Sequence, residues 1–261
     1  SFNNSPNAVS VNLGAGTVTA TSVSETGTGD IVVTGAHTIN TSAVNGTISL
    51  QELITLQNDL TLNAGTGTIN LTNVDTDVVG SHALSLTAGA DISFTINQRI
   101  DTLTINNGKA TDVTISGSLL ADNLNLASTN ANANLILAAD LSADNMSLTS
   151  EKQVQLNGNI TITNGGALTL KAGSATQDLT KTLTTPTLIL ETKTGTGDFT
   201  INSTTNAIDA VRTQDSDANS VQVAGNITVV STAATTTLGP ITTSSGGSLT
   251  ITHGANNLVI G

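Results

Sequence analysis

Short apolar triplets recur along nearly the whole chain of 261 residues, and this repetition limits what the chain can fold into. Each triplet has two apolar residues around a middle residue that is usually polar, and the starts are Leu60, Leu84, Leu103, Leu124, Met146, Leu168 and Leu188. A second series, from Ile69 to Phe199, runs about half a period out of phase. A unit this short cannot bury its own apolar face, so stacked copies must share one core.

The triplets predict short strands, because alternate residues of a strand point to opposite faces. Gly and Asn clusters separate them, for example at 63–67, 106–108 and 164–166, and such residues tolerate tight turns. We therefore expect an all-β fold, a right-handed parallel β-helix (β-solenoid) with coils of about 20–22 residues. One interior column is expected to contain Leu62, Leu84, Leu103, Leu124, Met146, Leu168 and Leu188.

An antiparallel β-sandwich is the alternative, since turn signals every 8–12 residues are typical of that fold. Two observations favour the solenoid. Sandwich cores use large aromatic side chains, whereas this chain has three Phe and no Trp or Tyr. In addition, nearly the same hexapeptide occurs at 26–31 and at 194–199, a separation that fits a whole number of coils.

No linker divides the chain, so 1–261 is expected to be a single β-solenoid segment. It begins without Met and stops within an apolar pair, and we interpret it as part of a longer protein. Three stretches lack clean triplets and are predicted to leave the solenoid as loop excursions: 171–187, 203–220 and 231–247. Loops on a rigid scaffold are common places for binding sites.

Charge and cysteine content exclude several function classes. The formal net charge is −12 and the pI about 4.2, which argues against nucleic acid and anionic membranes as partners. No Cys is present, so disulfides, thiolate metal sites and cysteine nucleophiles are excluded. Membrane insertion by this segment is not expected, because no apolar run approaches about 18 residues.

A single segment suggests metal binding. Asp215, Asp217 and Asn219 alternate oxygen ligands of the kind that Ca²⁺ prefers. An EF-hand loop would also need Gly and Glu where this chain has Ser220 and Asn226, so we interpret the run as a polar loop. No cofactor is expected. Calcium at this loop is the best metal candidate, and the shorter Asp75–Asp77 pair is a poorer one.

Three groups of residues contain side chains that catalysis uses, and we interpret each as a surface ion pair or loop cap. They are Arg99 with Asp101, Arg212 with Asp209 and Asp215, and His82 with Ser81 and Asp77. A catalytic triad is defined by geometry that adjacency in sequence cannot supply. His37, His82 and His253 are expected to be solvated turn or face residues. We therefore predict no catalytic residues and no enzymatic activity.

The segments Leu60–Leu71 and Leu84–Phe94 share much of the pattern Leu-x-Leu-x-Ala-Gly-x-Gly-x-Ile-x-Leu. This pattern resembles the repeats of large bacterial exoproteins, namely two-partner-secreted adhesins of the filamentous-haemagglutinin type and autotransporter passengers. The resemblance covers most of the chain. It implies a right-handed parallel β-helix that is exposed at, or released from, a bacterial surface.

The predicted function is a structural or adhesive shaft segment of an extracellular or bacterial cell-surface exoprotein. Its expected partners are a host or neighbouring-cell surface, or a second copy that associates through the coil ends. One alternative is a self-assembling extracellular filament or surface-layer subunit; another is a polysaccharide-active β-helix enzyme. Thr-x-Thr pairs such as Thr102–Thr104 resemble the arrays of ice-binding solenoids, but the middle position of successive triplets varies too much to predict that function.

Overall fold

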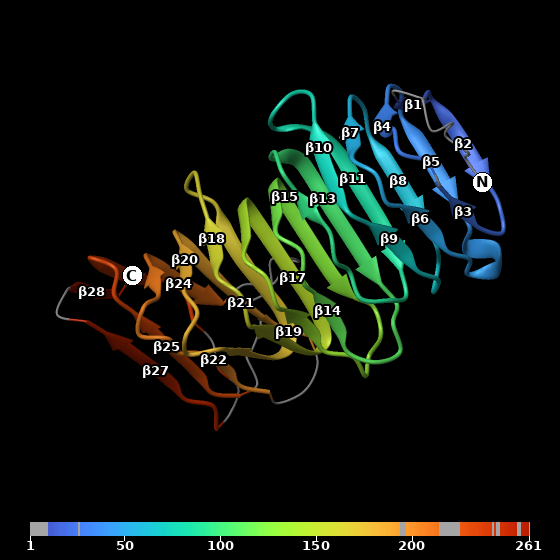
Figure 1. Ribbon diagram of the computed structural model, residues 1–261. Helices are drawn as coiled ribbons and strands as arrows, with labels where there is room; N and C mark the ends of the chain where they lie inside the picture. The colour runs from blue at the N-terminus through green and yellow to red at the C-terminus, as the bar shows by residue number, and fades with distance from the viewer. Residues whose placement is uncertain are drawn as a thin grey trace. The chain divides into compact units, whose positions relative to one another are not determined.

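The computed structural model describes residues 10–25, 27–193, 197–213, 225–241, 243, 246–254 and 257–260 (Figure 1). The fold is all-β, a β-solenoid of about 10 turns, as the repeat predicts. All strand pairings described within each unit below are parallel, which excludes the antiparallel sandwich. By its internal contacts the chain divides into two compact units, 1–130 and 131–261.

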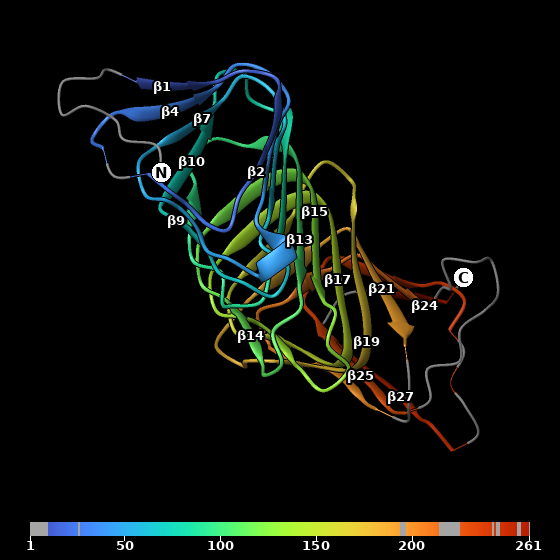
Figure 2. The same ribbon diagram turned by 90° about the vertical axis from the view of Figure 1, so that its right-hand side faces the viewer.

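The N-terminal unit winds three strands into each coil, so that three parallel sheets surround the core (Figure 2). The first sheet contains β1 (Ser10–Leu13), β4 (Asp30–Val33), β7 (Ile54–Leu56), β10 (Asn73–Thr76) and β12 (Thr95–Ile96). The second contains β2 (Gly16–Thr19), β5 (His37–Asn40), β8 (Leu60–Asn63), β11 (Ser81–Ala88), β13 (Ile100–Asn107) and β15 (Leu119–Ser128). The third contains β3 (Val23–Ser24), β6 (Ile48–Leu50) and β9 (Ile69–Leu71), while β14 (Val113–Ile115) is bridged to Ile92.

Helix is almost absent. Between β5 and β6 lies the short 3₁₀ helix η1 (Ser42–Val44), which ends at Asn45 in the left-handed conformation with φ 52°. No helix among the described residues has the length and apolar character needed to span a membrane.

The C-terminal unit also has parallel sheets, but here single strands bend across two of them. β17 (Leu141–Leu156) pairs through successive parts with β18 (Ile160–Ile162) and β19 (Ala167–Gln177), and its end also pairs with β16 (Leu135–Leu137). Later coils are formed by β20 (Leu183–Thr185), β21 (Thr187–Thr192), β22 (Phe199–Ile201), β23 (Ala207–Ile208), β24 (Ala210–Thr213), β25 (Ile227–Ser231), β26 (Thr235–Leu238), β27 (Leu249–His253) and β28 (Asn257–Ile260).

The core of each unit is a set of aliphatic columns. In the N-terminal unit Leu84 pairs with Leu103, which pairs with Leu124, and all three are fully buried. In the C-terminal unit Met146, Leu168 and Leu188 are aligned in the same way. These residues were predicted to share interior columns, and the prediction is confirmed within each unit.

One assignment in that column is wrong. The residue paired with Leu84 is Leu60, whereas Leu62 pairs with Leu86 in the neighbouring column. The coil from Leu60 to Leu84 is 24 residues long and includes the 77–80 turn. A regular spacing of about 22 residues, counted back from Leu84, leads to Leu62 instead, and the prediction therefore named the wrong residue.

The predicted excursion at 171–187 is also wrong. Residues up to Gln177 continue β19, and β20 occupies 183–185. The inward positions there are Ala172, Ala175 and Gln177, which are buried but are not the large aliphatic residues that mark the other strands. Within 203–220, β23 and β24 continue the coils up to Thr213, and 214–220 lie outside the described residues. Within 231–247, β26 pairs with β24 and β28.

Candidate functional surface

One outer face of the N-terminal unit carries a column of hydroxyl groups, one from each successive coil. The strand register places Thr17 beside Thr38, Thr38 beside Thr61, Thr61 beside Ser85, and Ser85 beside Thr104. We call these five residues the hydroxyl ladder. Asn125 extends the column by one more coil. Neighbouring strands lie about 4.8 Å apart, so the hydroxyls repeat at about that spacing along the stack.

The hydroxyls of the ladder are free to bind a partner. Their side chains are half-buried or exposed, and no hydrogen bond within the described residues uses these five hydroxyl groups. Inward neighbours such as Ile39 and Leu62 are fully buried, which fixes the strands and therefore the spacing of the hydroxyls. Each ladder residue thus presents a donor and an acceptor from a rigid support.

A second outward column on the same strands contains Thr19, Asn40, Asn63, Thr87 and Asn106. Its amides are partly engaged in turns. Asn40 Oδ1 accepts hydrogen bonds from the backbone N–H (3.0 Å) and hydroxyl (2.7 Å) of Ser42, and Asn63 Oδ1 accepts one from the Gly65 N–H at 3.0 Å. This column therefore shapes the coil corner, while the hydroxyl ladder stays available.

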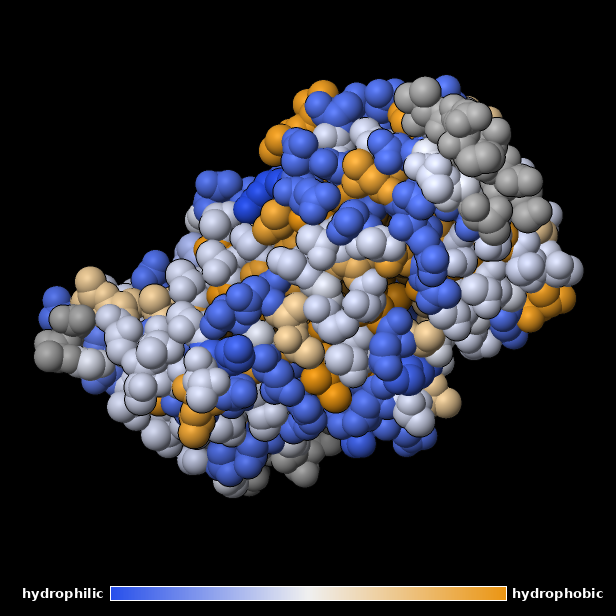
Figure 3. Space-filling view, in the orientation of Figure 1, coloured by the Kyte–Doolittle hydropathy of each residue, from blue (hydrophilic) through white to orange (hydrophobic). Residues whose placement is uncertain are grey.

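Neither column contains a charged residue, although Asp101 of β13 and Asp122 of β15 lie on the same sheet. Much of the surface visible in Figure 3 is pale, which is the colour of Thr, Ser and Gly near the middle of the hydropathy scale. The start of the ladder was not predicted from the sequence, because the triplet series begins at Leu60. Thr17 and Thr38 lie on earlier coils with weaker apolar patterns.

The ion pairs between Lys or Arg and a carboxylate join residues that are far apart in sequence. Lys109 Nζ lies 2.7 Å from Asp91, and Arg99 lies 3.4 Å from Asp122. Asp101, the predicted partner of Arg99, accepts a hydrogen bond from Thr102 Oγ1 at 3.1 Å. In the C-terminal unit Lys171 pairs with Glu191, and Lys193 pairs with Glu151.

Only two members of the possible triad come together. His82 Nε2 lies 2.9 Å from Asp77 Oδ1, and His82 has the unusual φ of 63° near the start of β11. Among the described contacts, no hydrogen bond joins the Ser81 hydroxyl to this pair. The arrangement is a hydrogen bond that closes a turn, in keeping with the predicted loop cap.

His37 differs from the prediction of a solvated residue. It lies in the interior column above Leu60 and is only 9% exposed. Its Nδ1 donates a hydrogen bond to the carbonyl oxygen of Gly14 at 2.6 Å, while its buried Nε2 has no partner. His253 is half-buried rather than solvated, and the buried Nε of Arg212 also has no hydrogen-bond partner.

Carboxylate oxygens at the corners accept hydrogen bonds, some from the next coil and some within the same turn. The Asn159 backbone N–H donates to Asp140 at 2.9 Å and lowers the pKa of that carboxyl. Thr180 lowers the pKa of Asp178 through two hydrogen bonds of 2.8 Å. Burial raises the pKa of Asp91, but the bonds from Lys109 and Thr114 outweigh burial and leave the pKa below its ordinary value.

The candidate calcium residues Asp215, Asp217 and Asn219 lie outside the described residues, so calcium binding there stays a prediction. Asp75 uses one carboxylate oxygen to accept the N–H of Thr76 at 2.8 Å. Across the described part of the chain, no three His, Asp or Glu side chains are grouped to hold a metal ion. Comparisons with protein-family models, curated proteins and solved structures find no match to this chain.

Proposed function

We propose that this chain is a non-enzymatic shaft segment of a bacterial surface-exposed or secreted exoprotein, and that the hydroxyl ladder is its adhesive face. The hydroxyl ladder supports this proposal: five free hydroxyls lie in register on a rigid sheet, in a column without charged residues. A repeated set of identical weak contacts suits adhesion to a large surface, where many contacts add up. A reaction centre would instead need different groups that converge on one point.

The charge distribution is compatible with this role. Residues 1–98 contain no Lys or Arg, so nonspecific attraction to anionic cell surfaces is weak there. Adhesion by the N-terminal unit would then depend on hydrogen bonds from the ladder rather than on charge. The partner is a host or neighbouring-cell surface that is rich in hydrogen-bonding groups.

The test couples the protein at high density to fluorescent beads and counts the beads that stay on a cultured epithelial monolayer and on a bacterial lawn after washing. The ladder variant is the triple substitution Thr38→Val, Thr61→Val and Thr104→Val, which removes hydroxyls while keeping side-chain shape. The matched control is Thr55→Val, Thr95→Val and Thr114→Val, at outward positions of β7, β12 and β14, outside the ladder.

We expect wild type and control to adhere to at least one surface and the ladder variant to lose about tenfold or more of the retained beads. Equal retention by the ladder variant and the control would contradict the assignment of this face. No retention of wild-type beads on either surface would contradict the adhesive role itself.

A further inference from the structure

The sequence has Asn followed directly by Gly at four places, and each such pair contains the atoms for a reaction of the chain with itself. The pairs begin at Asn45, Asn107, Asn157 and Asn164. In each pair the backbone nitrogen of Gly can attack the side-chain amide carbon of Asn, because Gly has no side chain that would hinder closure of the ring. The surroundings of the four pairs differ, and these differences decide which pair is free to react.

The reaction has two steps. The Gly nitrogen loses its proton and bonds to the Asn Cγ, while the Cγ–Nδ2 bond breaks and the side-chain nitrogen leaves as ammonia. Water then opens the five-membered succinimide at one of its two carbonyl carbons, which gives aspartate or isoaspartate. Water is the only co-reactant, and nothing is oxidised or reduced. The reaction therefore needs a Gly N–H without a hydrogen bond and a peptide that can rotate toward the side chain.

Asn107 is fully buried, and the groups that would react are all bonded. Its Nδ2 donates to the carbonyl oxygen of Ala90, and its Oδ1 accepts the Lys109 N–H at 2.9 Å. The N–H of Gly108 donates to the carbonyl oxygen of Ala88 at 2.7 Å. Both the amide and the attacking nitrogen are therefore held in place.

Asn45 is exposed, but its amide and the glycine that follows it are also held. The Asn45 Oδ1 accepts the N–H of Thr66 at 3.0 Å, and the Gly46 N–H donates to the Thr41 carbonyl oxygen at 3.1 Å. A Cβ built at Gly46 would lie 1.7 Å from the carbonyl oxygen of Thr21. The peptide that follows Asn45 therefore has no room to rotate.

Asn157 is protected by packing alone. Its side chain is exposed and makes no hydrogen bond within the described residues. Gly158 is buried, and a Cβ built there would lie 1.9 Å from the carbonyl oxygen of Ala139. This close contact fixes the peptide between Asn157 and Gly158.

The fourth pair lies in the turn between β18 and β19, where these restraints are missing. Asn164 and Gly165 are both exposed, with φ of 52° and 75°. A Cβ built at Gly165 meets no atom within 4 Å, and no hydrogen bond within the described residues uses the Gly165 N–H. The Asn164 Nδ2 donates to Asp144 Oδ2 at 2.9 Å, a bond at the exposed surface that water can replace. The peptide of this pair can therefore rotate.

We propose that Asn164 is a site of spontaneous deamidation and isomerisation, and that the fold protects Asn45, Asn107 and Asn157. The product changes the turn. Conversion to aspartate removes the donor to Asp144 and puts a second carboxylate beside it, and two like charges at this distance repel. The isoaspartate form also lengthens the backbone of the turn by one carbon atom.

The test incubates the folded protein for several weeks at mildly alkaline pH in water enriched in oxygen-18, which marks every succinimide that is hydrolysed. Peptide mass spectrometry then measures the labelled fraction at all four pairs of the same molecule. We expect Asn164 to react at least about tenfold faster than each of the other three, because those can react only when the coil opens locally. Asn164→Gln should remove the label from this turn.

The control repeats the incubation in urea at a concentration that unfolds the chain. All four pairs should then react at similar rates, because the fold no longer protects any of them. A lead of Asn164 that is as large in urea as in the folded protein would overturn the proposal, since the local sequence would then explain it. Equal labelling of the four pairs in the folded protein, or no label at Asn164 while the unfolded chain is labelled, would also overturn it.

A second measurement tests the effect on the turn. Asn164→Asp imitates one product and should lower the thermal midpoint, because it replaces the bond to Asp144 by repulsion. The matched control Asn157→Asp adds the same charge at an exposed amide that makes no hydrogen bond within the described residues, and should leave the midpoint unchanged. Equal midpoints for the two variants would overturn the proposed effect of the reaction on the turn.

Discussion

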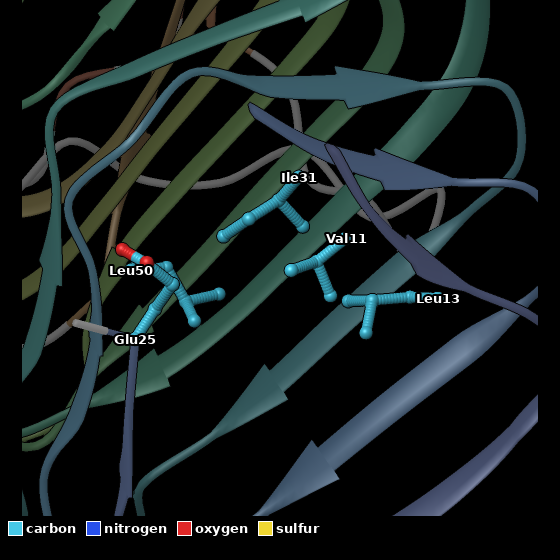
Figure 4. Close-up of a pocket in the computed structure, with 5 residues that line it drawn as sticks. All are labelled: Val11, Leu13, Glu25, Ile31 and Leu50. Carbon is cyan, nitrogen blue, oxygen red and sulfur yellow. The ribbon is translucent and has the colours of Figure 1, made fainter. Parts of the chain in front are cut away.

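At the scale of single residues, the buried polar side chains among the described residues of the N-terminal unit include Glu25 and His37, both at the first coils. Neither was predicted from the sequence. The triplet pattern identifies interior positions by large apolar residues, so a polar residue at such a position is interpreted as a surface residue. Figure 4 shows the side chains of Glu25 and Leu50 among those that line a small hollow. Only the register, which places His37 with Leu60 and Glu25 over Leu50, reveals them.

His37→Leu is expected to stabilise the protein. The substitution removes the unpartnered Nε2 and continues the column of Leu60, whereas the lost bond to Gly14 leaves an oxygen at an exposed position that water can reach. The gain in unfolding free energy should be about 1 kcal/mol, measured as a higher denaturation midpoint in urea.

His82→Leu is the contrasting variant and should destabilise the protein, because it breaks the hydrogen bond to Asp77 and puts a branched side chain at positive φ. A lower midpoint for His37→Leu would contradict this account.

Asp140 gives a prediction about pH. Its folded-state pKa is lowered by the Asn159 N–H, so its contribution to stability is present above about pH 4 and lost as pH falls through the folded-state pKa. Asp140→Asn keeps an oxygen acceptor but does not titrate. We expect the wild type to be more stable than this variant at pH 6, with the difference in thermal midpoint disappearing near pH 2.

The control for this prediction is Asp30→Asn, at an exposed carboxyl that makes no hydrogen bond within the described residues. The gap in thermal midpoint between wild type and Asp30→Asn should not change with pH in this way. A constant gap for Asp140→Asn across the same range would show that the Asn159 bond does not depend on the ionised carboxylate.

At the scale of strands and coils, successive coils approach closely enough to require glycine at some corners. A Cβ built at Gly117 would lie 1.6 Å from the carbonyl oxygen of Phe94. Gly117→Ala must therefore push adjacent coils apart, and we expect a loss of about 1–3 kcal/mol in unfolding free energy. At Gly14 a Cβ meets nothing within 4 Å, so Gly14→Ala should change stability little. Similar urea midpoints for the two variants would contradict the close packing of these coils.

The aliphatic columns predict a sharp difference between neighbouring residues of β15. Leu124 is fully buried, and Asn125 points outward. Leu124→Asp buries an unpaired carboxylate and should cost several kcal/mol, whereas Asn125→Asp should stay within about 0.5 kcal/mol of wild type. Chemical denaturation followed by circular dichroism measures both. An unchanged midpoint for Leu124→Asp would show that the inward register of β15 is wrong.

The sequence predicted the parallel coils because period-two triplets and glycine-rich turns directly reflect short strands and corners. It did not predict the register of every coil. Both apolar residues of a triplet can fill a column, so Leu60 and Leu62 are equivalent until the length of the intervening turn is known. Where Ala172, Ala175 and Gln177 fill the interior, the pattern fades, and the part of β19 from residue 171 onward was interpreted as a loop.

At the scale of the whole molecule, the account depends on a parallel stack that repeats the same outward position once per coil. The hydroxyl ladder, its proposed adhesive role and the placement of Glu25 over Leu50 all depend on this register. Two other proposals do not depend on this register: calcium binding at Asp215, Asp217 and Asn219, and the exoprotein origin.

Distances between nitroxide spin labels along the ladder test this claim most directly. The chain has no Cys, so pairs of introduced cysteines can be labelled without background. Three proteins combine Thr17→Cys with Ser85→Cys, Thr104→Cys or Asn125→Cys, and pulsed electron paramagnetic resonance measures each distance. The account predicts mean distances that grow in equal steps of about 4.8 Å from one protein to the next, because each partner lies one coil further along the stack. Distances that stay constant, or that change without this order, would contradict the parallel solenoid.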